Sequence, residues 1–497
     1  MPVSEMLQRA PPLKFDDGSC RAAAPPAVSR VFFDCTATVE NDANTGIQRV
    51  VRNIVNAARQ IGPVLGLECQ GVAFDLRHGF VPVERLETPN PAASGLMRAG
   101  ESLGRKVRIC LKEWLTSIGL MDAARATRRG WQTARYQSLF PARRRSQRSV
   151  RWRPGDVLLL IDTSWVPGFP WTDVCEAQAR GALVGTVLYD LIPLQFPNVV
   201  GEGTKELYGR WWNKARTVSD FVIGISNSVL DDITAVDRAS RKAGVPHKAT
   251  RAASFRLGAE LDAAATRGPV REEFVAAFDN LKLSTETSVL STQYSEYRIL
   301  KRNPPSLTYL MVGMISPRKN HVLALDAFDR LWSAGSPVRL AIAGKYGWDC
   351  RTLIDRIRRH PEYGRKLFWF EDVHDSELDY CYRQAAALMT PSYAEGFNLP
   401  IVEALYRGCP VLASDLPVHR EVGGDFAAYF PLGNAVALAG LVARQQRSGA
   451  VDGVRPADQF RWPNWSESCR DLLHHVLELS SPTISAWCRT NTTRFVA

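Results

Sequence analysis

The chain has 497 residues, of which 45% are hydrophobic and 23% charged, so it has the composition of an ordinary globular protein and is too long for one hydrophobic core. No low-complexity tract interrupts it, and we expect two or three domains. The net charge of +11 is concentrated between residues 101 and 153, where fourteen Lys and Arg stand against three Asp and Glu. The remainder of the chain is close to neutral, so any basic surface must come from this one segment.

Cysteine usage and hydropathy both indicate a cytoplasmic protein. The ten cysteines are scattered, with no CxxC pair and no His at zinc spacing, as in reduced cytosolic proteins. The N-terminus lacks the apolar core of a signal peptide, and no apolar run is long enough to span a bilayer. We expect a soluble protein, or one attached peripherally to the inner face of the plasma membrane.

Both halves of the chain alternate short apolar runs with segments of helical periodicity. In the first half, strands are expected at 31–34, 156–162, 183–193 and 220–226. A helix is expected within 45–62, and Asn227 or Ser228 is placed to cap another. In the second half, strands are expected at 307–315, 338–345, 366–372, 386–392 and 410–415, with helices at 321–335 and 375–386 between them.

Continuous apolar strands that alternate with helices predict parallel sheets covered on both faces. We therefore expect an α/β protein with two doubly wound, Rossmann-like domains that face a cleft, and a ligand at the carboxyl ends of their strands. The expected division is an extension at 1–29, a first domain at 30–265 with a basic insertion at about 98–153, a linker at 266–305, a second domain at 306–462, and a closing helix with a tail at 463–497.

The chain lacks the common nucleotide-binding motifs, but cationic and glycine-containing loops follow its expected strands. There is no GxxxxGK[ST] and no GxGxxG after a strand, which weighs against a P-loop hydrolase and a dinucleotide oxidoreductase. Instead, "VGMISPRKNH" presents Arg318 and Lys319, and "AGKYGW" places Gly344 and Lys345 at the end of the next strand. Gly46 opens a helix whose N-terminus suits a phosphate. Together these predict a diphosphate site; the alternative is that Arg318 and Lys319 are ordinary surface charges.

The stretch "PSYAEGFNLPIVEAL" holds two acidic residues around a predicted helix start. A helix beginning near Leu399 or Pro400 is favoured because proline is tolerated in a first helical turn. Glu403 would then lie close to the helix N-terminus, where the dipole favours a carboxylate. Locally, Glu403 could be a surface residue matched to the dipole and Glu395 a loop charge.

In its second half the chain resembles the donor-binding domain of retaining GT-B glycosyltransferases of family 4. The matching segments occur in family order and include "VGMISPRKN", "AIAGKYGW" and the paired glutamates of "EGFNLPIVE" in their glycine and proline context. "DCTATVENDANTGIQRVVR" and "LYDLIPLQFP" are similar to bacterial mannosyltransferases of O-antigen or exopolysaccharide synthesis, and "WSESCRDLL" resembles the closing helix of GT-B enzymes. The chain departs from relatives at Tyr189-Asp190, where many have His-Asp, so a role for that His is not carried over.

The resemblance assigns roles to particular residues. Glu395 would accept hydrogen bonds from the donor sugar, Glu403 would hold the ribose, and Arg318 with Lys319 would neutralise the leaving diphosphate. Asp190 would orient the acceptor or be a structural residue at a strand end, while His321 and His419 are expected to be structural. The expected catalytic residues are Glu395, Arg318, Lys319 and Asp190. The expected donor-binding residues are Gly46, Gly313, Arg318, Lys319, Gly344, Lys345, Val373, Glu395, Gly396, Phe397, Asn398, Leu399 and Glu403.

The implied activity is that of a retaining, metal-independent hexosyltransferase without a cofactor. It would move mannose from GDP-mannose to a saccharide, in particular a lipid-linked one, by front-face attack in which the departing phosphate oxygen helps to deprotonate the acceptor. Another GT-B enzyme of sugar nucleotides, such as a non-hydrolysing epimerase or a transferase with a different donor, is the alternative.

The basic segment allows three interpretations. Its Arg residues alternate with Trp, Tyr and Phe, which would suit nucleic acid. However, six apolar residues recur at helical spacing beside four cations, which favours a basic amphipathic helix on an anionic membrane surface: Leu103, Val107, Leu111, Trp114, Ile118 and Met121. A solvated insertion on the first domain is the third interpretation, and no nucleic-acid partner is expected.

Overall fold

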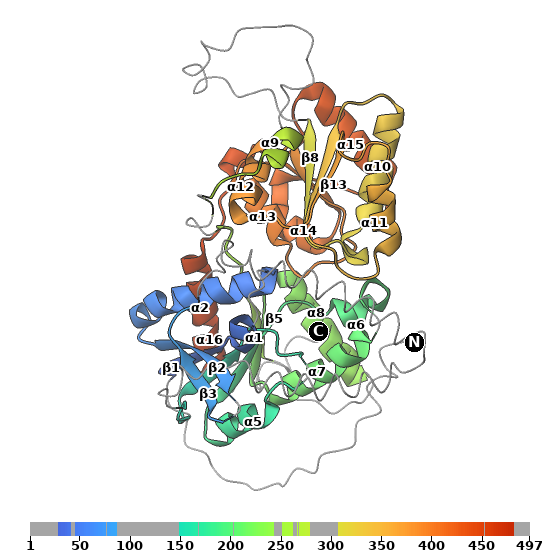
Figure 1. The fold of residues 1–497 in the computed structure, drawn as a ribbon. Helices are drawn as coiled ribbons and strands as arrows, with labels where there is room; N and C mark the ends of the chain where they lie inside the picture. The colour runs from blue at the N-terminus through green and yellow to red at the C-terminus, as the bar shows by residue number, and fades with distance from the viewer. Residues whose placement is uncertain are drawn as a thin grey trace, which may run out of the picture.

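A computed structural model describes residues 28–40, 45–75, 77–86, 149–166, 168–201, 203–242, 251–261, 266, 268–278, 307–451 and 453–481. The described residues form two α/β lobes, one above the other in Figure 1, each built around its own sheet. The predicted fold class, GT-B with two Rossmann-like domains, is confirmed. Most of the basic segment lies outside the described residues, and so does most of the expected linker.

The first domain contains a seven-stranded sheet in the order β3-β2-β1-β4-β5-β6-β7. Its strands are β1 Arg30–Asp34, β2 Glu68–Asp75, β3 Gly79–Val83, β4 Asp156–Leu160, β5 Leu183–Leu188, β6 Phe221–Gly224 and β7 Ala252–Ser254. All neighbours pair in parallel except β2 and β3, which form an antiparallel edge. Successive side chains of β1 alternate between two cores: Val31 and Phe33 face one, and Phe32 faces the other.

The helices of this domain are α1 Thr36–Glu40, α2 Gly46–Val64, α5 Trp171–Ala179, α6 Ile192–Gln195, α7 Thr204–Val218 and α8 Asn227–Lys242, with a 3₁₀ turn η4 at Pro197–Val199. The predicted cap of α8 was wrong by one residue. The helix begins at Asn227, and the Ser226 hydroxyl oxygen accepts from the Val229 N–H at 3.1 Å, three residues along. The backbone N–H groups of Asn227 and Ser228 instead donate to the carboxylate of Glu421 in the second domain.

The second domain contains a six-stranded parallel sheet in the order β10-β9-β8-β11-β12-β13. Its strands are β8 Thr308–Val312, β9 Arg339–Ala343, β10 Leu367–Phe370, β11 Ala387–Thr390, β12 Val411–Ser414 and β13 Ala427–Phe430. The first five fall within the predicted ranges, whereas β13 was not predicted. Its helices are α9 Glu272–Phe278, α10 His321–Ser333, α11 Arg351–Arg358, α12 Asp375–Gln384, α13 Leu399–Tyr406, α14 Pro417–Gly423 and α15 Ala435–Ser448, with 3₁₀ turns η8 Pro317–Lys319, η9 Gly424–Phe426 and η10 Ala457–Gln459.

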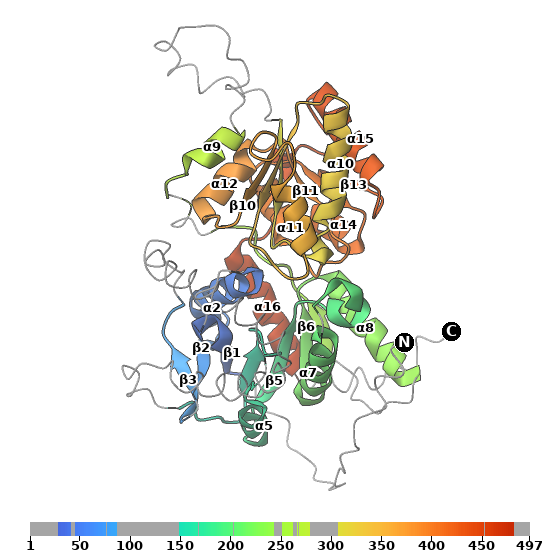
Figure 2. The ribbon, with the colours of Figure 1, turned by 45° about the vertical axis from the view of Figure 1, so that its right-hand side comes forward.

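Helix α9 lies in the range expected to be a linker, yet it packs on the second domain (Figure 2). The ring of Phe274 stacks on Phe370 with centroids 4.1 Å apart, and the Thr308 hydroxyl donates to the Ala277 carbonyl at 2.8 Å. Arg271, just before the helix, pairs with the buried Glu377 at 2.5 Å. The chain therefore reaches the second domain before its first strand.

Helix α16, Trp465–Ser480, returns from the second domain and packs against α2 of the first (Figures 1 and 2). The Trp465 indole N–H donates to the Glu260 carbonyl at 2.9 Å, and the Ser468 hydroxyl donates to the Arg256 carbonyl at 2.6 Å. Leu472 and Val476 are fully buried in the core of the first domain. The last described helix thus completes the domain in which the chain began.

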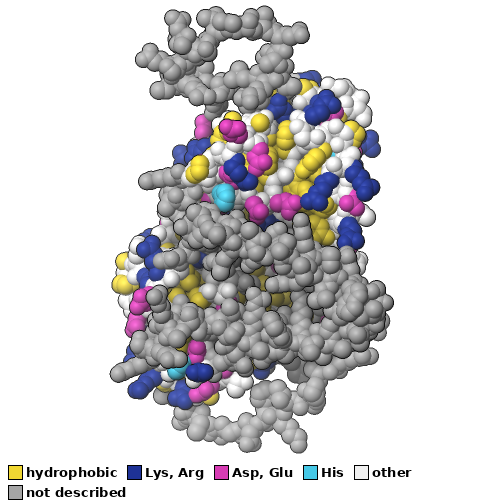
Figure 3. Space-filling view, in the orientation of Figure 1, with side chains coloured by type: hydrophobic (Ala, Val, Ile, Leu, Met, Phe, Trp, Pro, Cys, Tyr) yellow, Lys and Arg dark blue, Asp and Glu magenta, His cyan; other side chains and the backbone are white. Residues whose placement is uncertain are grey.

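On the face of the second domain seen in Figure 3, acidic and basic side chains are interspersed. This agrees with a charge balance near zero outside the basic segment. Within the described ranges, no helix is both long enough and apolar enough to cross a membrane.

Candidate functional site

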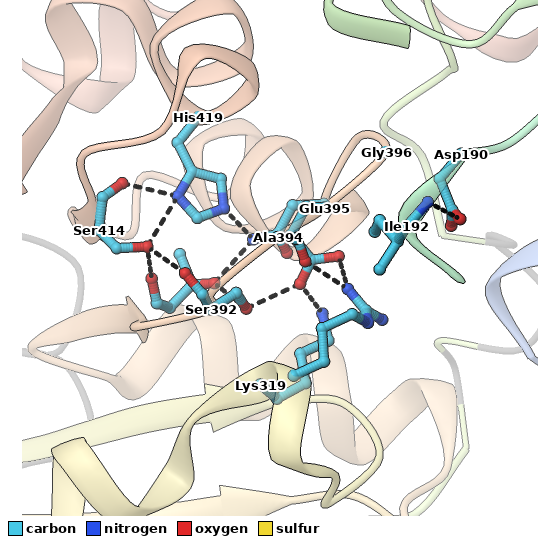
Figure 4. A network of polar contacts seen from close by, with 12 residues as sticks. Asp190, Ile192, Lys319, Ser392, Ala394, Glu395, Gly396, Ser414 and His419 are labelled. Carbon is cyan, nitrogen blue, oxygen red and sulfur yellow. Dashed lines mark hydrogen bonds and ion pairs between the residues drawn. The ribbon is translucent and has the colours of Figure 1, made fainter. Parts of the chain in front are cut away.

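The cationic loops meet at the carboxyl end of the second sheet. Turn η8, which follows β8, carries Arg318 and Lys319, and the loop after β11 carries Glu395. Because β8 and β11 are parallel neighbours, their carboxyl ends lie side by side and bring the three side chains together. Figure 4 shows this cluster facing Asp190, which belongs to the first domain.

Glu395 is held by two cations and a hydroxyl. Lys319 Nζ lies 2.6 Å from its Oε1, the Ser392 hydroxyl donates to the same oxygen at 2.7 Å, and Arg318 pairs with Oε2. The side chain of Glu395 is only 6% exposed. Burial alone would raise the pKa of this carboxyl, but Arg318 and Lys319 outweigh burial and hold the pKa well below its ordinary value. Glu395 therefore stays ionised and neutralises the two buried cations.

Asp190 approaches the same cluster from the first domain. It follows β5, and its Oδ1 accepts the Ile192 N–H at 3.1 Å. Its backbone carbonyl accepts from the Tyr208 hydroxyl at 2.6 Å. Burial raises the pKa of Asp190 above the ordinary value, and the nearby Arg318 partly opposes that rise. Asp190 and Arg318 line one cavity of about 430 Å³.

A buried network fixes the loop that carries Glu395. Asn398 has a left-handed backbone (φ 75°), and its amide contacts the Thr390 hydroxyl at 2.7 Å and His419 Nε2 at 2.8 Å. His419 Nδ1 lies 2.8 Å from the Ser414 carbonyl, and burial lowers the pKa of His419, so the ring is neutral and donates from Nδ1. His419 acts on the site through Asn398 and does not face the cavity. Burial likewise lowers the pKa of His321 to about 3.

Glu403 is buried, and both of its carboxylate oxygens have partners, one of them across the domain boundary. Its Oε1 lies 2.5 Å from Arg49 Nη1 of α2, and its Oε2 accepts from the Tyr382 hydroxyl at 2.8 Å. Arg49 also pairs with Asp375 at 3.2 Å. Burial would lower the pKa of Arg49, but the two acids raise it above its ordinary value. The sequence motif "TGIQRVVR" gave Arg49 no role, although its place one turn after Gly46 is the signal that could have drawn attention to it.

The remaining residues predicted to bind the donor fall into two groups. The first group consists of glycines at which loops approach one another. A Cβ on Gly344 would lie 1.9 Å from the Gly313 carbonyl, and a Cβ on Gly396 would lie 1.9 Å from the Tyr189 carbonyl. Gly46 has more room, because a Cβ there would lie 3.9 Å from Leu399.

The other group has side chains that point elsewhere. Phe397 is buried against Trp462, with ring centroids 6.0 Å apart, and Val373 packs on the apolar core. Lys345 is 67% exposed and lies 3.7 Å from Asp372, outside the cluster around Glu395. Among the described residues, no three His, Cys, Asp or Glu side chains gather as a metal site would require.

Comparison with known proteins finds a family match over the second domain of the chain. Residues 295–444 match the family described as "Glycosyl transferases group 1". The matched segment contains the cluster of Arg318, Lys319 and Glu395, and it also contains Glu403.

Several curated proteins are similar over a larger part of the chain. The serotype-specific mannosyltransferase WbdA of Escherichia coli is 28% identical over 452 residues, 90% of this chain and 45% of that protein. O-antigen chain mannosyltransferase B of the same organism is 29% identical over 162 residues, 31% of this chain and 42% of that protein. The chain thus spans less than half the length of these relatives. Among solved structures, Anabaena Alr3699/HepE in complex with UDP-glucose superposes with a TM-score of 0.46 at 12% identity, covering 92% of this chain and 99% of that one.

Proposed function

We propose that the protein is a retaining glycosyltransferase that moves mannose from GDP-mannose to a saccharide in the synthesis of a bacterial surface polysaccharide. The observation that carries the proposal is the pair of buried cations, Arg318 and Lys319, on Glu395 within the segment that matches the group 1 glycosyl transferases. The names of the similar proteins, all mannosyltransferases of Escherichia coli, Salmonella typhimurium or Mycobacterium leprae, support the choice of mannose.

In this proposal the donor diphosphate binds Arg318 and Lys319 and competes for them with Glu395. The bond between the sugar carbon and the phosphate oxygen breaks, and the acceptor oxygen forms its bond on the same face of the sugar. The acceptor proton passes to the departing phosphate oxygen, so no protein nucleophile is needed. The two cations stabilise the charge that develops on the leaving group, and electrostatic stabilisation of this kind often contributes more to the rate than any other effect. Glu395, freed from the cations, accepts from a hydroxyl of the donor sugar.

Glu403 is proposed to hold the ribose hydroxyls. Both of its oxygens already have partners, Arg49 and Tyr382, but a carboxylate oxygen has lone pairs for more than one donor. Gly344 leaves no room for a side chain because a Cβ there would lie 1.9 Å from the Gly313 carbonyl, so the two loop backbones meet beside Lys319.

The test is a thermal-shift series with GDP, UDP, dTDP and ADP, followed by a transfer assay with and without EDTA. A nucleotide at about 100 times its dissociation constant should add about 2.7 kcal/mol of stability. GDP is expected to give the largest shift, and transfer is expected to persist in EDTA because the cations replace a metal. A larger shift with another base would overturn GDP-mannose, and activity lost in EDTA and restored by Mg²⁺ would overturn the metal-free mechanism.

The acceptor is proposed to be lipid-linked and reached from an anionic membrane surface. The support is the charge of residues 101–153, fourteen Lys and Arg against three Asp and Glu, of which the structure describes only 149–153. Juxtamembrane cations contribute about 1 kcal/mol each, an attraction that salt screens. The protein should therefore sediment with phosphatidylglycerol vesicles at low salt. A variant with Arg143, Arg144, Arg145 and Arg148 changed to Ser should remain in the supernatant, and equal sedimentation of both would contradict the proposal.

A further inference from the structure

The cavity beside Arg318 is lined mainly by residues of the first domain, but an indole of the second domain forms part of its wall. Besides Trp348, its lining residues are Asp190, Ile192, Pro193, Val200, Gly201, Thr204 and Arg318. Trp348 follows β9 of the second domain, yet its ring lies over Gly201 of the first, where a Cβ would be 3.7 Å from the indole Cδ1. The volume of about 430 Å³ lies within the ~300–1,000 Å³ range of small-molecule sites.

The chemistry of this cavity is divided between an apolar wall and a few polar groups. Ile192, Pro193, Val200 and the half-buried Trp348 form the wall, while Asp190, Thr204 and Arg318 supply the polar groups. The indole Nε1 of Trp348 is buried, and among the described residues it has no hydrogen-bond partner. Because this nitrogen is closed off from solvent, Trp348 offers the cavity the carbon surface of its ring and not an N–H donor. A pyranose ring has the matching character, with an apolar face and hydroxyls at its edge.

The lining residues also separate this cavity from the donor groups. Lys319, Glu395 and Glu403, which are proposed to hold the donor, do not line it. Six of its eight lining residues belong to the first domain, and Arg318 is the member shared with the cluster around Glu395. A sugar in the cavity would therefore lie next to the diphosphate at Arg318 without occupying the donor's own place.

We propose that this cavity is the acceptor subsite, in which the terminal pyranose of the acceptor glycan stacks on Trp348 and hydrogen-bonds Asp190 and Thr204. The inference rests on the proposed function for the identity of the reaction. In this proposal the ring on which the acceptor stacks, Trp348, belongs to the second domain, whereas most lining residues belong to the first. The subsite is therefore complete only when both domains are in place.

The test measures binding and turnover separately. Binding of methyl α-mannobioside to the GDP-saturated protein is measured by titration calorimetry, and steady-state assays give the KM of acceptor and donor. Trp348→Ala should weaken acceptor binding and raise the acceptor KM about tenfold or more, with the donor KM unchanged. Trp348→Phe, which keeps an aromatic face, should restore affinity to within about threefold of wild type. Tyr346→Ala is the matched control, because this ring lies on the same loop, is 46% exposed and does not line the cavity.

The possible results separate the two proposals. Acceptor binding that depends on Trp348 in a protein that fails to transfer mannose would uphold the subsite and overturn the function. Transfer with an acceptor KM that Trp348→Ala leaves unchanged would uphold the function and overturn the subsite. A donor KM that rises in place of the acceptor KM, or a wild-type protein that binds no saccharide, would also overturn the subsite. A melting temperature for Trp348→Ala close to that of wild type excludes misfolding as the cause of lost binding.

Discussion

At the scale of single residues, the carboxylate oxygens of Glu395 and Glu403 already have partners within the protein. Glu395 is engaged by Arg318, Lys319 and Ser392, and its low pKa keeps it ionised. The sequence motif identified the residue but not these partners, because spacing along a chain does not show which side chains compensate one another. In this arrangement Glu395 and a diphosphate would compete for the same two cations.

Glu395→Gln is expected to raise the affinity for free GDP about tenfold and to lower turnover on the order of 10²-fold. The neutral amide leaves Arg318 and Lys319 to the diphosphate, while the sugar loses its charged acceptor. Calorimetry with GDP and a transfer assay measure the two effects. Glu371→Gln, which removes a carboxylate paired with the exposed Arg358 at 3.1 Å, is the control. Weaker GDP binding in Glu395→Gln would rule out the competition.

Asp34 at the end of β1 gives a second prediction, which concerns stability and pH. Its Oδ1 accepts from the Thr36 N–H at 3.1 Å, whereas its buried Oδ2 has no partner among the described residues. Burial and the neighbouring Asp162 raise the pKa of Asp34 from 3.8 to about 7. The folded state therefore binds more protons than the unfolded state between these values, and the stability contributed by Asp34 falls as pH rises through this window.

Asp34→Asn should remove this pH dependence. Relative to wild type, the variant should gain stability between pH 5 and pH 7, by at most about 1.4 kcal/mol per pH unit. Urea unfolding of both proteins at several pH values measures the difference. A constant difference across that range would show that Asp34 does not titrate there.

At the scale of elements, the chain pattern predicted strands and helices well where each has a clear apolar period. The strands β8 to β12 and the start of α13 at Leu399 follow from apolar runs and from proline in a first turn. Strands β3, β7 and β13 were missed because short edge strands carry little periodic signal. Strand β2, with eight residues, was also missed because Gln70 and Gly71 interrupt its apolar run. Helix α9 was missed because the contacts that hold it, with Phe370 and Thr308, are made to residues distant in sequence.

Helix α2 is joined to α12 and α13 by Arg49, which lies between Asp375 and Glu403. Arg49→Gln should lower the free energy of unfolding by about 3–5 kcal/mol, because two largely buried acids lose their shared cation. Chemical denaturation measures the loss, and Arg180→Gln, from the exposed pair with Glu176, should cost no more than about 1 kcal/mol. Adding Glu403→Gln to Arg49→Gln should recover part of the loss. Equal losses of unfolding free energy in Arg49→Gln and Arg180→Gln would show that the interdomain pairs of Arg49 stabilise the protein no more than an exposed pair does.

At the scale of the whole molecule, the alternating pattern predicted two sheets but not the way the domains meet. The contacts that join them connect residues far apart in sequence. The Ser226 hydroxyl donates to the Gly396 carbonyl at 2.7 Å, and Glu421 accepts from the Ser228 hydroxyl at 2.9 Å. No local period encodes such pairs, so the two sheets were predictable while the geometry of the site between them was not.

Gly396 offers the sharpest test of this interdomain geometry. A Cβ at this position would lie 1.9 Å from the Tyr189 carbonyl and 3.1 Å from Asp190 Cβ, both in the first domain, whereas its backbone φ is not in the left-handed region. Gly396→Ala should therefore leave the second domain intact and push the first away from it. We expect near wild-type binding of GDP, a larger radius of gyration by small-angle X-ray scattering, and turnover reduced on the order of 10²-fold, as displacement of reacting groups by about 1 Å can cause.

Gly440→Ala, in α15, adds the same methyl group where only the Arg444 side chain lies nearby at 3.5 Å, and should behave like wild type in all three measurements. If Gly396→Ala also kept the wild-type radius and turnover, the closed arrangement of the domains would not be the one that catalyses transfer.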